Sequence, residues 1–325
     1  MRVLVTGGTG QIGSEVARQL VARGDEVRCL VRDPSRARLL DGVPVELCAG
    51  DVTDPDSLEP AAAGCEAVVH LAGVVSYWRP RRAMQEAVNV GGTRNVIEAA
   101  VAAGARRLLL TSSMATLGYV EGDGEGDEDT AYNWGPFDLG YMESKKAAEE
   151  LVLGEDRIEG LAVNPGIVFG ARDLHRNGGR MLIALSEGGP PAYPCGATTC
   201  ANLRDVAAGH LLALDRGRAG RRYVLGGTTG SFGEIFEKVA AVVGQEPPRR
   251  MAGPGAMWLY GALSELGAAF RKAEPPATRA LSVISSRNRR YSSARAVAEL
   301  GYHPAPLEEG IAACLEWYRA EGVVP

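Results

Sequence analysis

The sequence predicts an α/β protein with a doubly wound parallel sheet and a smaller, mostly helical region toward the C-terminus. Two observations lead to this prediction. Short, almost continuously apolar runs alternate with helical patterns in the first half of the chain, and a glycine-rich turn directly follows the first run. Apolar strands of this kind are buried on both faces of a parallel sheet. Because crossovers between parallel strands are right-handed, helices then cover both sides of the sheet.

The first half of the chain contains most of the expected strands. The first is residues 3–5, and the helix that follows carries Ile12, Val16 and Leu20 at four-residue spacing, which places them on one face. Residues 84–103 show the longest helical pattern of this half. The further strand candidates are residues 27–31, 43–47, 68–71, 108–110 and 161–169.

The pattern is looser after residue 170. Residues 171–200 contain repeated glycines and prolines and predict a loop-rich insertion. Strand and helix patterns return at 202–214 and 223–225, and helices are expected at 232–243, 257–270 and 306–318. We therefore expect a cofactor-binding domain of residues 1–170, to which residues 201–228 return. Residues 171–200 and 229–325 would form the substrate-binding region.

The composition limits the function. The 325 residues are 46% hydrophobic and 23% charged, as in a folded globular chain. A net charge of −5 and only 6% aromatic residues argue against a nucleic-acid partner. The four histidines and six cysteines show no metal-ligand spacing, so we expect no metal. The chain starts directly with a strand, and Pro254 and Glu265 interrupt its longest apolar stretch, so we expect a cytoplasmic protein without a membrane segment.

The first strand leads into the turn Thr6-Gly7-Gly8-Thr9-Gly10-Gln11-Ile12-Gly13. Gly8, Gly10 and Gly13 fit the pattern G-x-G-x-x-G, while Gly7, Gly10 and Gly13 fit the wider G-x-x-G-x-x-G. Side chains here would keep a diphosphate away from the N–H groups at the start of the next helix. Because the turn follows the first strand of a parallel α/β pattern, it predicts a dinucleotide in a Rossmann-type sheet rather than a generic tight turn.

The end of the second strand predicts which dinucleotide is bound. An NAD site has a carboxylate about 20 residues beyond the glycines, where it accepts hydrogen bonds from the ribose 2′-OH. Arg32 stands here directly before Asp33, and Arg36 and Arg38 follow. A guanidinium would pair with the 2′-phosphate of NADP, and about 1.5–3 kcal/mol corresponds to a ten- to hundredfold preference. NADP(H) is therefore the predicted cofactor, and NAD(H), with Asp33 at the ribose, is the alternative.

The candidate catalytic residues lie after the strand at 108–110 and at the start of a later helix. Thr111, Ser112 and Ser113 stand at the carboxyl end of that strand, where open α/β sheets bind their ligands. Tyr141 and Lys145 are four residues apart, so both project from one helix face. A phenol pKa must fall by ~3 units, or ~4 kcal/mol, to approach neutrality, and a nearby ammonium supplies part of that shift.

These motifs together make the chain resemble the extended short-chain dehydrogenase/reductase family, also called the NAD-dependent epimerase/dehydratase family. The similar segments run in family order over roughly residues 1–215, and the remaining residues match only in general layout. The similar segments are Thr6 to Gly13, Gly50-Asp51-Val52, His70-Leu71-Ala72-Gly73, Asn89-Val90-Gly91-Gly92-Thr93, Thr111-Ser112-Ser113, Tyr141 to Lys145, Asn164-Pro165-Gly166, Phe169-Gly170 and Asn202 to Ala207.

The resemblance implies a role for each matched position. Tyr141 would be the general acid and base, and Lys145 would bind the nicotinamide ribose and lower the tyrosine pKa. Ser113 would hydrogen-bond the substrate oxygen, with Ser112 or Thr111 as alternatives. Asn89 would support the site, with local packing as its alternative explanation. The other cofactor contacts would be Gly7, Thr9, Gly10, Gln11, Ile12, Gly13, Arg32, Asp51, Val52, Leu71, Ala72, Gly73, Thr111, Pro165, Gly166 and Ile167.

Within the family, the chain looks like the branch of dihydroflavonol reductases and hydroxysteroid dehydrogenases. Arg32-Asp33-Pro34 resembles the cofactor segment of those NADP-dependent reductases, whereas Ser113-Met114-Ala115 and Met142 depart from the sugar dehydratases and epimerases. We therefore expect hydride transfer between NADP(H) and a ketone, aldehyde or secondary alcohol. A nucleotide-sugar epimerase and an NADP-binding regulatory protein are the alternatives.

The substrate is expected to be small and apolar or aromatic. Tyr77, Trp78, Trp134 and Met142 favour this, although each could equally pack the fold. Members of the family often dimerise through the helix that carries Tyr141 and the long helix before it, so a homodimer is expected by analogy. The expected pocket segments are residues 74–78, 114–117, 132–137, 168–173 and the insertion up to 199.

Overall fold

A seven-stranded parallel sheet forms the centre of the molecule. The computed structural model describes residues 1–271 and 273–325. The strand order is β10-β6-β5-β4-β1-β2-β3, and every neighbouring pair is parallel. The order reverses beside β1, which creates the crevice where doubly wound sheets bind ligands. The strands are β1 (Arg2–Thr6), β2 (Glu26–Val31), β3 (Glu46–Ala49), β4 (Ala67–His70), β5 (Arg107–Thr111), β6 (Glu159–Pro165) and β10 (Arg222–Leu225).

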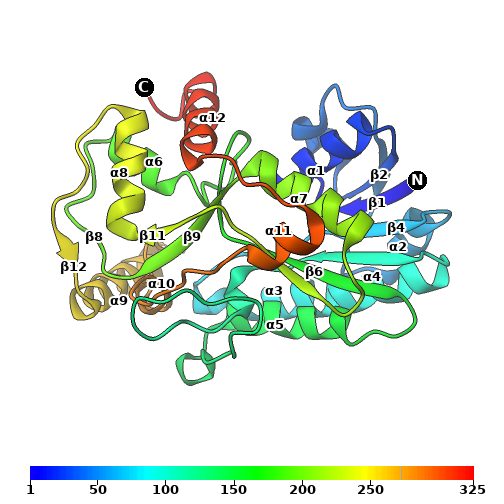
Figure 1. Cartoon of the computed structure of the whole chain (residues 1–325), viewed down its shortest axis with the longest axis horizontal. Helices are drawn as coiled ribbons and strands as arrows, with labels where there is room; N and C mark the ends of the chain where they lie inside the picture. Colours follow the sequence, from blue (N-terminus) through cyan, green and yellow to red (C-terminus); the bar gives the residue numbers. More distant parts are fainter. Residues whose placement is uncertain (272) are drawn as a thin grey trace.

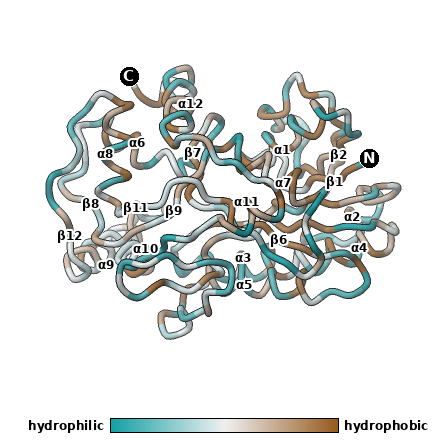
Figure 2. The backbone as a smooth tube through the Cα atoms, in the orientation of Figure 1, coloured by the Kyte–Doolittle hydropathy of each residue, from teal (hydrophilic) through white to brown (hydrophobic). Residues whose placement is uncertain are grey.

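Helices cover both faces of this sheet (Figure 1). Residues alternate between the two faces along a strand, so Val3 and Val5 join one apolar cluster and Leu4 joins the other. The first cluster includes residues of α1 (Gln11–Ala22), α7 (Leu203–Arg216) and α11 (Ala294–Leu300). The second includes residues of α2 (Pro55–Ala62), α4 (Gly92–Ala102) and α5 (Gly140–Leu153). In Figure 2, β1 and β2 are mainly hydrophobic, as strands between two helix layers must be.

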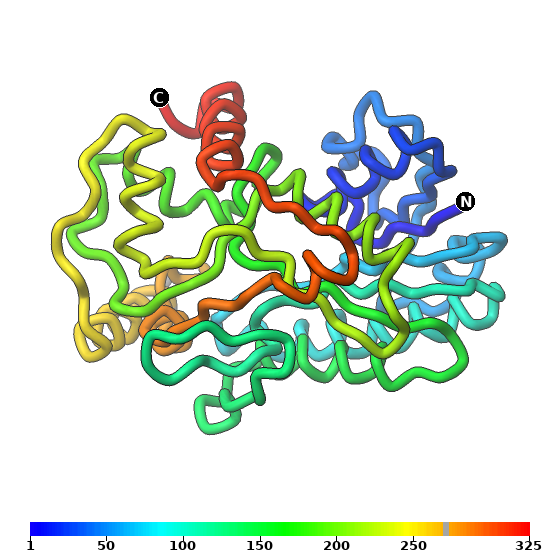
Figure 3. The backbone as a smooth tube through the Cα atoms, viewed as in Figure 1, coloured from blue at the N-terminus to red at the C-terminus, as the bar shows by residue number. Residues whose placement is uncertain are grey.

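A smaller region lies beyond the carboxyl ends of these strands. One three-stranded sheet has the order β11 (Thr228–Ser231), β9 (Ala197–Asn202), β7 (Ile167–Phe169), and β8 (Tyr193–Pro194) pairs with β12 (Met251–Ala252). Figure 3 shows the last part of the chain crossing from this region to the main sheet at α11 and returning to α12. Its helices are α6 (Arg180–Ser186), α8 (Phe232–Val243), α9 (Pro254–Arg271), α10 (Arg279–Ser285) and α12 (Leu307–Ala320).

The structure confirms the predicted fold class and most of the predicted elements. The helix expected at 232–243 matches α8, and the strands expected at 3–5, 27–31, 108–110 and 223–225 all lie in the main sheet. The helical pattern at 84–103 contains α3 (Arg82–Gln85), a π-helical segment, η4 (Glu86–Gly91), and α4. Among the helices of the described residues, none has the length and apolar character needed to span a bilayer.

The structure differs in detail from the predicted elements in three places. The strand expected at 43–47 begins only at Glu46, because the N–H of Val45 bonds the carbonyl of Val43 in a turn. The strand expected at 161–169 is two strands in different sheets, and they separate at Gly166, where a Cβ would lie 2.5 Å from the Thr199 carbonyl oxygen. The insertion at 171–200 is rich in loops, as expected, but it also contains α6, β8 and most of β9.

Candidate active site

The glycine turn lies where the cofactor diphosphate was predicted. Gly7 has a φ of +73°, and a Cβ on it would lie 2.6 Å from the backbone nitrogen of Ala72. A Cβ on Gly13 would lie 2.2 Å from the carbonyl oxygen of Gly7. Gly10 precedes α1 and supplies no side-chain cap. The first N–H groups of α1 are therefore left to an external acceptor, and the bare backbone fits a diphosphate.

Arg32 directly follows β2 at the surface, beside an acid whose carboxylate is already hydrogen-bonded within its own turn. The carboxylate of Asp33 accepts hydrogen bonds from the backbone N–H and the hydroxyl of Ser35, at 3.0 and 2.6 Å, and these bonds lower its pKa. The Arg32 guanidinium has no hydrogen bond or ion pair with the described residues. The only acid directly after β2 therefore caps its own turn, whereas the adjacent cation remains available to a ligand.

The two residues predicted at the adenine differ in their surroundings. The carboxylate of Asp51 accepts hydrogen bonds from the N–H and hydroxyl of Thr53, at 2.9 and 2.8 Å. Val52 is buried, and its side chain packs against Gly92. The structure therefore gives the side chain of Val52 a packing role at the start of α4.

Asn89 fixes the loop after β4 against the catalytic helix. Its side-chain oxygen accepts a 2.7 Å hydrogen bond from the N–H of Val74, and its side-chain nitrogen donates to the Ser144 hydroxyl at 3.0 Å. A Cβ on Gly73 would lie 3.2 Å from the same side-chain oxygen. Asn89 therefore supports the Gly73 loop through a buried hydrogen-bond network, as a neighbour of the site.

Tyr141 and Lys145 project from the first turns of α5 into a cavity of about 370 Å³. The Lys145 ammonium donates a 2.7 Å hydrogen bond to the carbonyl of Thr111, and burial lowers its pKa to about 8. The pKa of Tyr141 is raised, in contrast to the lowering that the spacing led us to expect. Burial and the adjacent phenol of Tyr77, whose ring centroid lies 5.5 Å away, outweigh a hydrogen bond with Ser113 that lowers it.

Of the three hydroxyl residues after β5, Ser113 is the one whose side chain meets Tyr141. Its oxygen accepts a 3.1 Å hydrogen bond from the N–H of Ala115, which leaves the hydroxyl proton free to donate. The Thr111 hydroxyl instead shares a 2.8 Å hydrogen bond with His210 in the protein interior. Burial lowers the pKa of His210 to about 4, so this histidine is neutral.

Most of the predicted contacts around the nicotinamide line the same cavity. It is enclosed by α1, by the loops after β4, β5 and β6, and by residues 274–289, which the sequence did not single out. The predicted site residues that are absent from its lining are Gly7, Thr9, Gly10, Gly13, Arg32, Asp51, Val52, Ala72 and Asn89. The predicted residues that do line it are Gln11, Ile12, Leu71, Gly73, Thr111, Ser113, Tyr141, Lys145, Pro165, Gly166 and Ile167.

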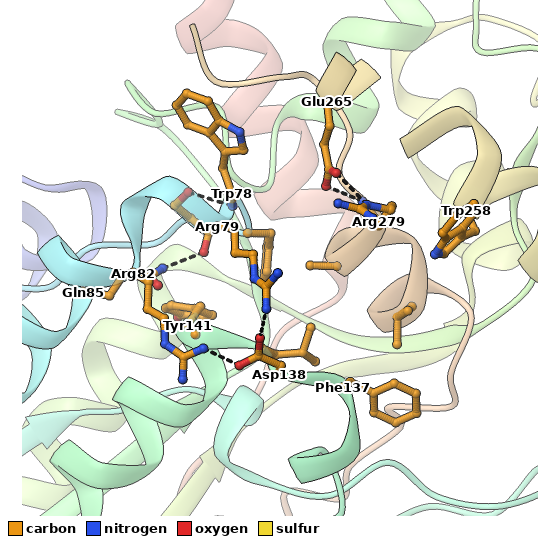
Figure 4. Close-up of a pocket in the computed structure, with 16 residues that line it drawn as sticks. Trp78, Arg79, Arg82, Gln85, Phe137, Asp138, Tyr141, Trp258, Glu265 and Arg279 are labelled. Atoms are coloured by element: carbon orange, nitrogen blue, oxygen red, sulfur yellow. Dashed lines mark hydrogen bonds and ion pairs between the residues drawn. The ribbon is translucent and has the colours of Figure 1, made fainter. Parts of the chain in front are cut away.

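A second cavity, of about 270 Å³, reaches Tyr141 from the side of α9 and α10 (Figure 4). Tyr77, Trp78, Phe137 and Trp258 contribute aromatic surface to it. Ion pairs form part of its wall. Asp138 binds both Arg79 and Arg82, and Glu265 binds Arg279 at 2.7 Å. Ser76, Tyr77 and Tyr141 line both cavities, so the two spaces meet at Tyr141.

Two predicted pocket residues belong to the core instead. Trp134 and Met142 are completely buried and line neither of these cavities. The Trp134 ring lies 4.8 Å from that of Tyr119, and its indole N–H donates to the carbonyl of Leu117. An aromatic residue near a site is thus no sign of a ligand contact when its polar atom is already satisfied inside the fold.

Glu149 is a buried part of the site that the sequence reasoning missed. It is 2% exposed and stands one helical turn beyond Lys145. Its carboxylate accepts hydrogen bonds from Asn164 at 2.6 Å, from Thr116 at 3.0 Å and from Arg222 at 2.7 Å. Asn164 also donates to the carbonyl of Ser113 at 3.1 Å. The spacing Tyr141, Lys145, Glu149 on one helix face was the signal available in the sequence.

The whole chain can be compared with known proteins. The model of the NAD dependent epimerase/dehydratase family matches residues 3–226. Sterol demethylase protein B of Methylococcus capsulatus is 32% identical, with both chains covered completely. A putative dihydroflavonol 4-reductase of Synechocystis is also 32% identical, over 98% of this chain and 95% of that protein. The crystal structure of gox2253 has a TM-score of 0.87 and 34% identity, with 99% of each chain covered.

The matched region contains both the glycine turn and the Tyr141–Lys145 pair. Among residues 1–271 and 273–325, no group of three or more histidine, cysteine, aspartate or glutamate side chains is placed to hold a metal ion. This chain belongs to the NAD-dependent epimerase/dehydratase family, the extended short-chain dehydrogenases/reductases.

Proposed function

We propose that the protein is an NADP(H)-dependent oxidoreductase that interconverts a ketone or aldehyde and an alcohol. The observation that carries this proposal is the convergence of Ser113, Tyr141 and Lys145 on the cavity that begins at the start of α1. The relatives named as reductases and the family match support the same reaction class. The substrate would be a small apolar or aromatic molecule, as the aromatic lining near Tyr141 favours.

The reaction needs a proton donor and a group that stabilises the forming oxyanion. NADPH, when bound, supplies the hydride to the carbonyl carbon. Tyr141, protonated at neutral pH because its pKa is raised, donates its proton to the carbonyl oxygen as that oxygen gains charge. The free hydroxyl proton of Ser113 stabilises the same oxygen. The Lys145 ammonium then stabilises the tyrosinate, and the reverse reaction uses these groups in the opposite order.

Arg32 is the residue that we propose to select NADP over NAD. Its guanidinium lies just after β2 without a protein partner among the described residues, while the Asp33 carboxylate is hydrogen-bonded by Ser35. In the same proposal, residues 1–170 and 201–228 bind the cofactor, and residues 171–200 and 229–325 bind the substrate. We further propose that the enzyme works in the cytoplasm as a homodimer formed through α4 and α5.

The Tyr141→Phe variant tests the proposed chemistry. It removes the proton donor and keeps the ring, so NADPH-dependent reduction should fall by about 10²–10⁴-fold while NADPH binding is retained. The measurements are NADPH oxidation with a panel of aryl and alkyl ketones and a fluorescence titration of NADPH. Tyr260→Phe, at a 61% exposed position, is the matched control and should retain wild-type activity. Wild-type activity of Tyr141→Phe would contradict the proposal.

The same preparation distinguishes the alternatives. A sugar epimerase oxidises and reduces one substrate on a retained cofactor, so purified protein with tightly bound NAD(H) and no NADPH consumption would favour that activity. NADP binding without oxidation by any carbonyl compound would favour a regulatory protein. Net consumption of NADPH with release of NADP⁺ supports the oxidoreductase.

A further inference from the structure

Arg289 is a buried cation in the larger cavity without a polar partner. Only 5% of the residue is exposed, and it lines the cavity that contains Tyr141 and Lys145. Its Nε is completely enclosed and makes no hydrogen bond. Among the described residues, its guanidinium forms no hydrogen bond or ion pair at all. Buried charges are normally paired, because an unpaired one lowers the stability of the folded state.

The backbone of Arg289 is held firmly beside β9. Its N–H donates a 3.0 Å hydrogen bond to the carbonyl of Ala197, and its carbonyl accepts one from the Thr199 hydroxyl at 3.3 Å. The next residue but one, Tyr291, donates its N–H to the same hydroxyl at 2.8 Å. These hydrogen bonds hold the backbone of Arg289 in a fixed position in the cavity wall. A ligand group that meets it needs little reorganisation of the protein.

The other charged groups of this cavity have partners. The Lys145 ammonium donates to the carbonyl of Thr111 at 2.7 Å, and Arg180 contacts the carbonyl of Pro276 at 3.4 Å. Glu274, the one acid in the lining, accepts a 2.6 Å hydrogen bond from the Ser76 hydroxyl and lies 3.8 Å from Arg81. Three cations thus face one acid, and that acid is bound to other groups. The cavity has an excess of positive charge at Arg289.

The positive charge of Arg289 acts on Tyr77, which lies beside Tyr141 in the same cavity. Burial raises the pKa of Tyr77, and the charges of Arg289 and Arg180 act in the opposite direction on the same phenol. The ring of Tyr77 lies edge-on to that of Tyr141. Apolar side chains of Met114, Met181 and Ile284 line the space as well. A ligand that complements both the Arg289 cation and the apolar side chains has an apolar body and one anionic group.

We propose that Arg289 binds a carboxylate of the substrate, so that the enzyme acts on small apolar or aromatic oxo acids and the corresponding hydroxy acids. A guanidinium presents parallel N–H donors that match the two oxygens of a carboxylate, and the pair is strong where water is excluded. A single carboxylate also balances the single unpaired charge. This inference rests on the proposed function, since it names the substrate class of the same site.

Ligand binding tests the proposal without turnover. The protein saturated with NADP⁺ is titrated calorimetrically with 4-acetylbenzoate and with 4-acetylbenzamide, its uncharged counterpart. We expect the carboxylate to bind at least 10-fold more tightly, and Arg289→Met to abolish this difference. Arg290→Met is the matched control, because Arg290 is the next residue, lies outside the cavity lining and faces Glu234 at 3.9 Å. This control should keep the preference for the carboxylate.

Further measurements identify the alternatives. Equal binding of acid and amide, or a preference that survives in both Arg289→Met and the polar variant Arg289→Gln, would overturn the proposal. A loss of NADP⁺ affinity in Arg289→Met as large as its loss of carboxylate affinity would also overturn the proposal, because Arg289 would then be a cofactor contact. Tighter binding of phenyl phosphate than of 4-acetylbenzoate would assign the site to phosphate esters and overturn the carboxylate assignment.

Thermal unfolding gives a readout that is independent of ligands. Removal of an unpaired buried cation by an apolar side chain of similar length should raise the melting temperature of Arg289→Met, whereas Arg290→Met should not. A lower melting temperature of Arg289→Met would make the guanidinium a structural group and contradict the proposal. The proposed oxidoreductase activity is tested separately. Normal ketone reduction by Tyr141→Phe would contradict that activity, whatever the ligand titrations and the thermal unfolding of the Arg289 variants show.

Discussion

At the scale of single residues, burial decides the protonation of the site. Burial lowers the pKa of Lys145 to about 8 and raises that of Tyr141, because both charged forms lose solvation inside the cavity. The charge of Glu149 acts on Lys145 in the opposite direction and raises its pKa. Glu149 is thus a positioning residue with two effects, since it also holds the Ser113 loop through Asn164.

The pH dependence of reduction should report these pKa values. Lys145 is charged below about pH 8 and neutral above it, so kcat/KM for NADPH-dependent reduction should fall as the pH rises through about 8. Glu149→Gln removes the charge that raises this pKa, so the fall should begin at lower pH, with kcat reduced several-fold. Glu150→Gln, at an exposed position paired with Lys146, is the control and should leave the profile unchanged. A profile of Glu149→Gln identical to that of the wild type would exclude this role.

At the scale of elements, backbone approach explains why the cofactor turn can be recognised. Helix α1 starts so close to β1 that a Cβ on Gly13 would lie 2.2 Å from the Gly7 carbonyl oxygen. On α5, the four-residue spacing of Tyr141 and Lys145 is enough to direct both side chains into one cavity. Both features are local in sequence, so both were predicted.

The substitution Gly13→Ala should push the start of α1 away from the backbone of Gly7. The added methyl group meets backbone atoms, which cannot rotate away, so we expect about 1–3 kcal/mol loss of stability and at least tenfold weaker NADPH binding. Denaturant unfolding and a fluorescence titration measure the two effects. Gly267→Ala in α9 is the control, because a Cβ there meets open space. Unchanged cofactor binding in Gly13→Ala would argue against a diphosphate at this turn.

At the scale of the whole molecule, the active site is assembled from distant parts of the chain. One cavity is lined by Gln11 on the first helix, by Tyr141 on α5 and by Arg289 near the C-terminal end. The two smaller sheets and α8 to α10 close the space beyond the strand ends (Figure 1). Ligand binding therefore connects regions that fold around separate apolar clusters.

The cofactor should stabilise the entire fold, and NADPH more than NADH. A tenfold difference in affinity corresponds to about 1.4 kcal/mol at equal, saturating concentrations. Thermal unfolding with each cofactor should show the difference, and Arg32→Ser should remove it. Arg38→Ser is the control, because Arg38 is already paired with Glu321 at 3.0 Å. Equal stabilisation of the wild-type protein by both cofactors would refute the role of Arg32.

The sequence alone was sufficient for the parallel sheet, the glycine turn, the Tyr141–Lys145 pair and the family, because apolar strand patterns and short motifs that can be read locally indicate each of them. It missed where β3 begins and the short elements within residues 171–200, because the exposed edge of a sheet and pairing with remote strands decide the structure there. Only the tertiary structure shows that Trp134 belongs to the core, that Glu149 supports the Ser113 loop through Asn164 and that Arg289 lines the cavity. Burial and the pairing of charges depend on contacts between different elements, such as the ion pair of Glu149 with Arg222 and the bond that holds Arg289 beside Thr199, and these contacts cannot be read from a local pattern.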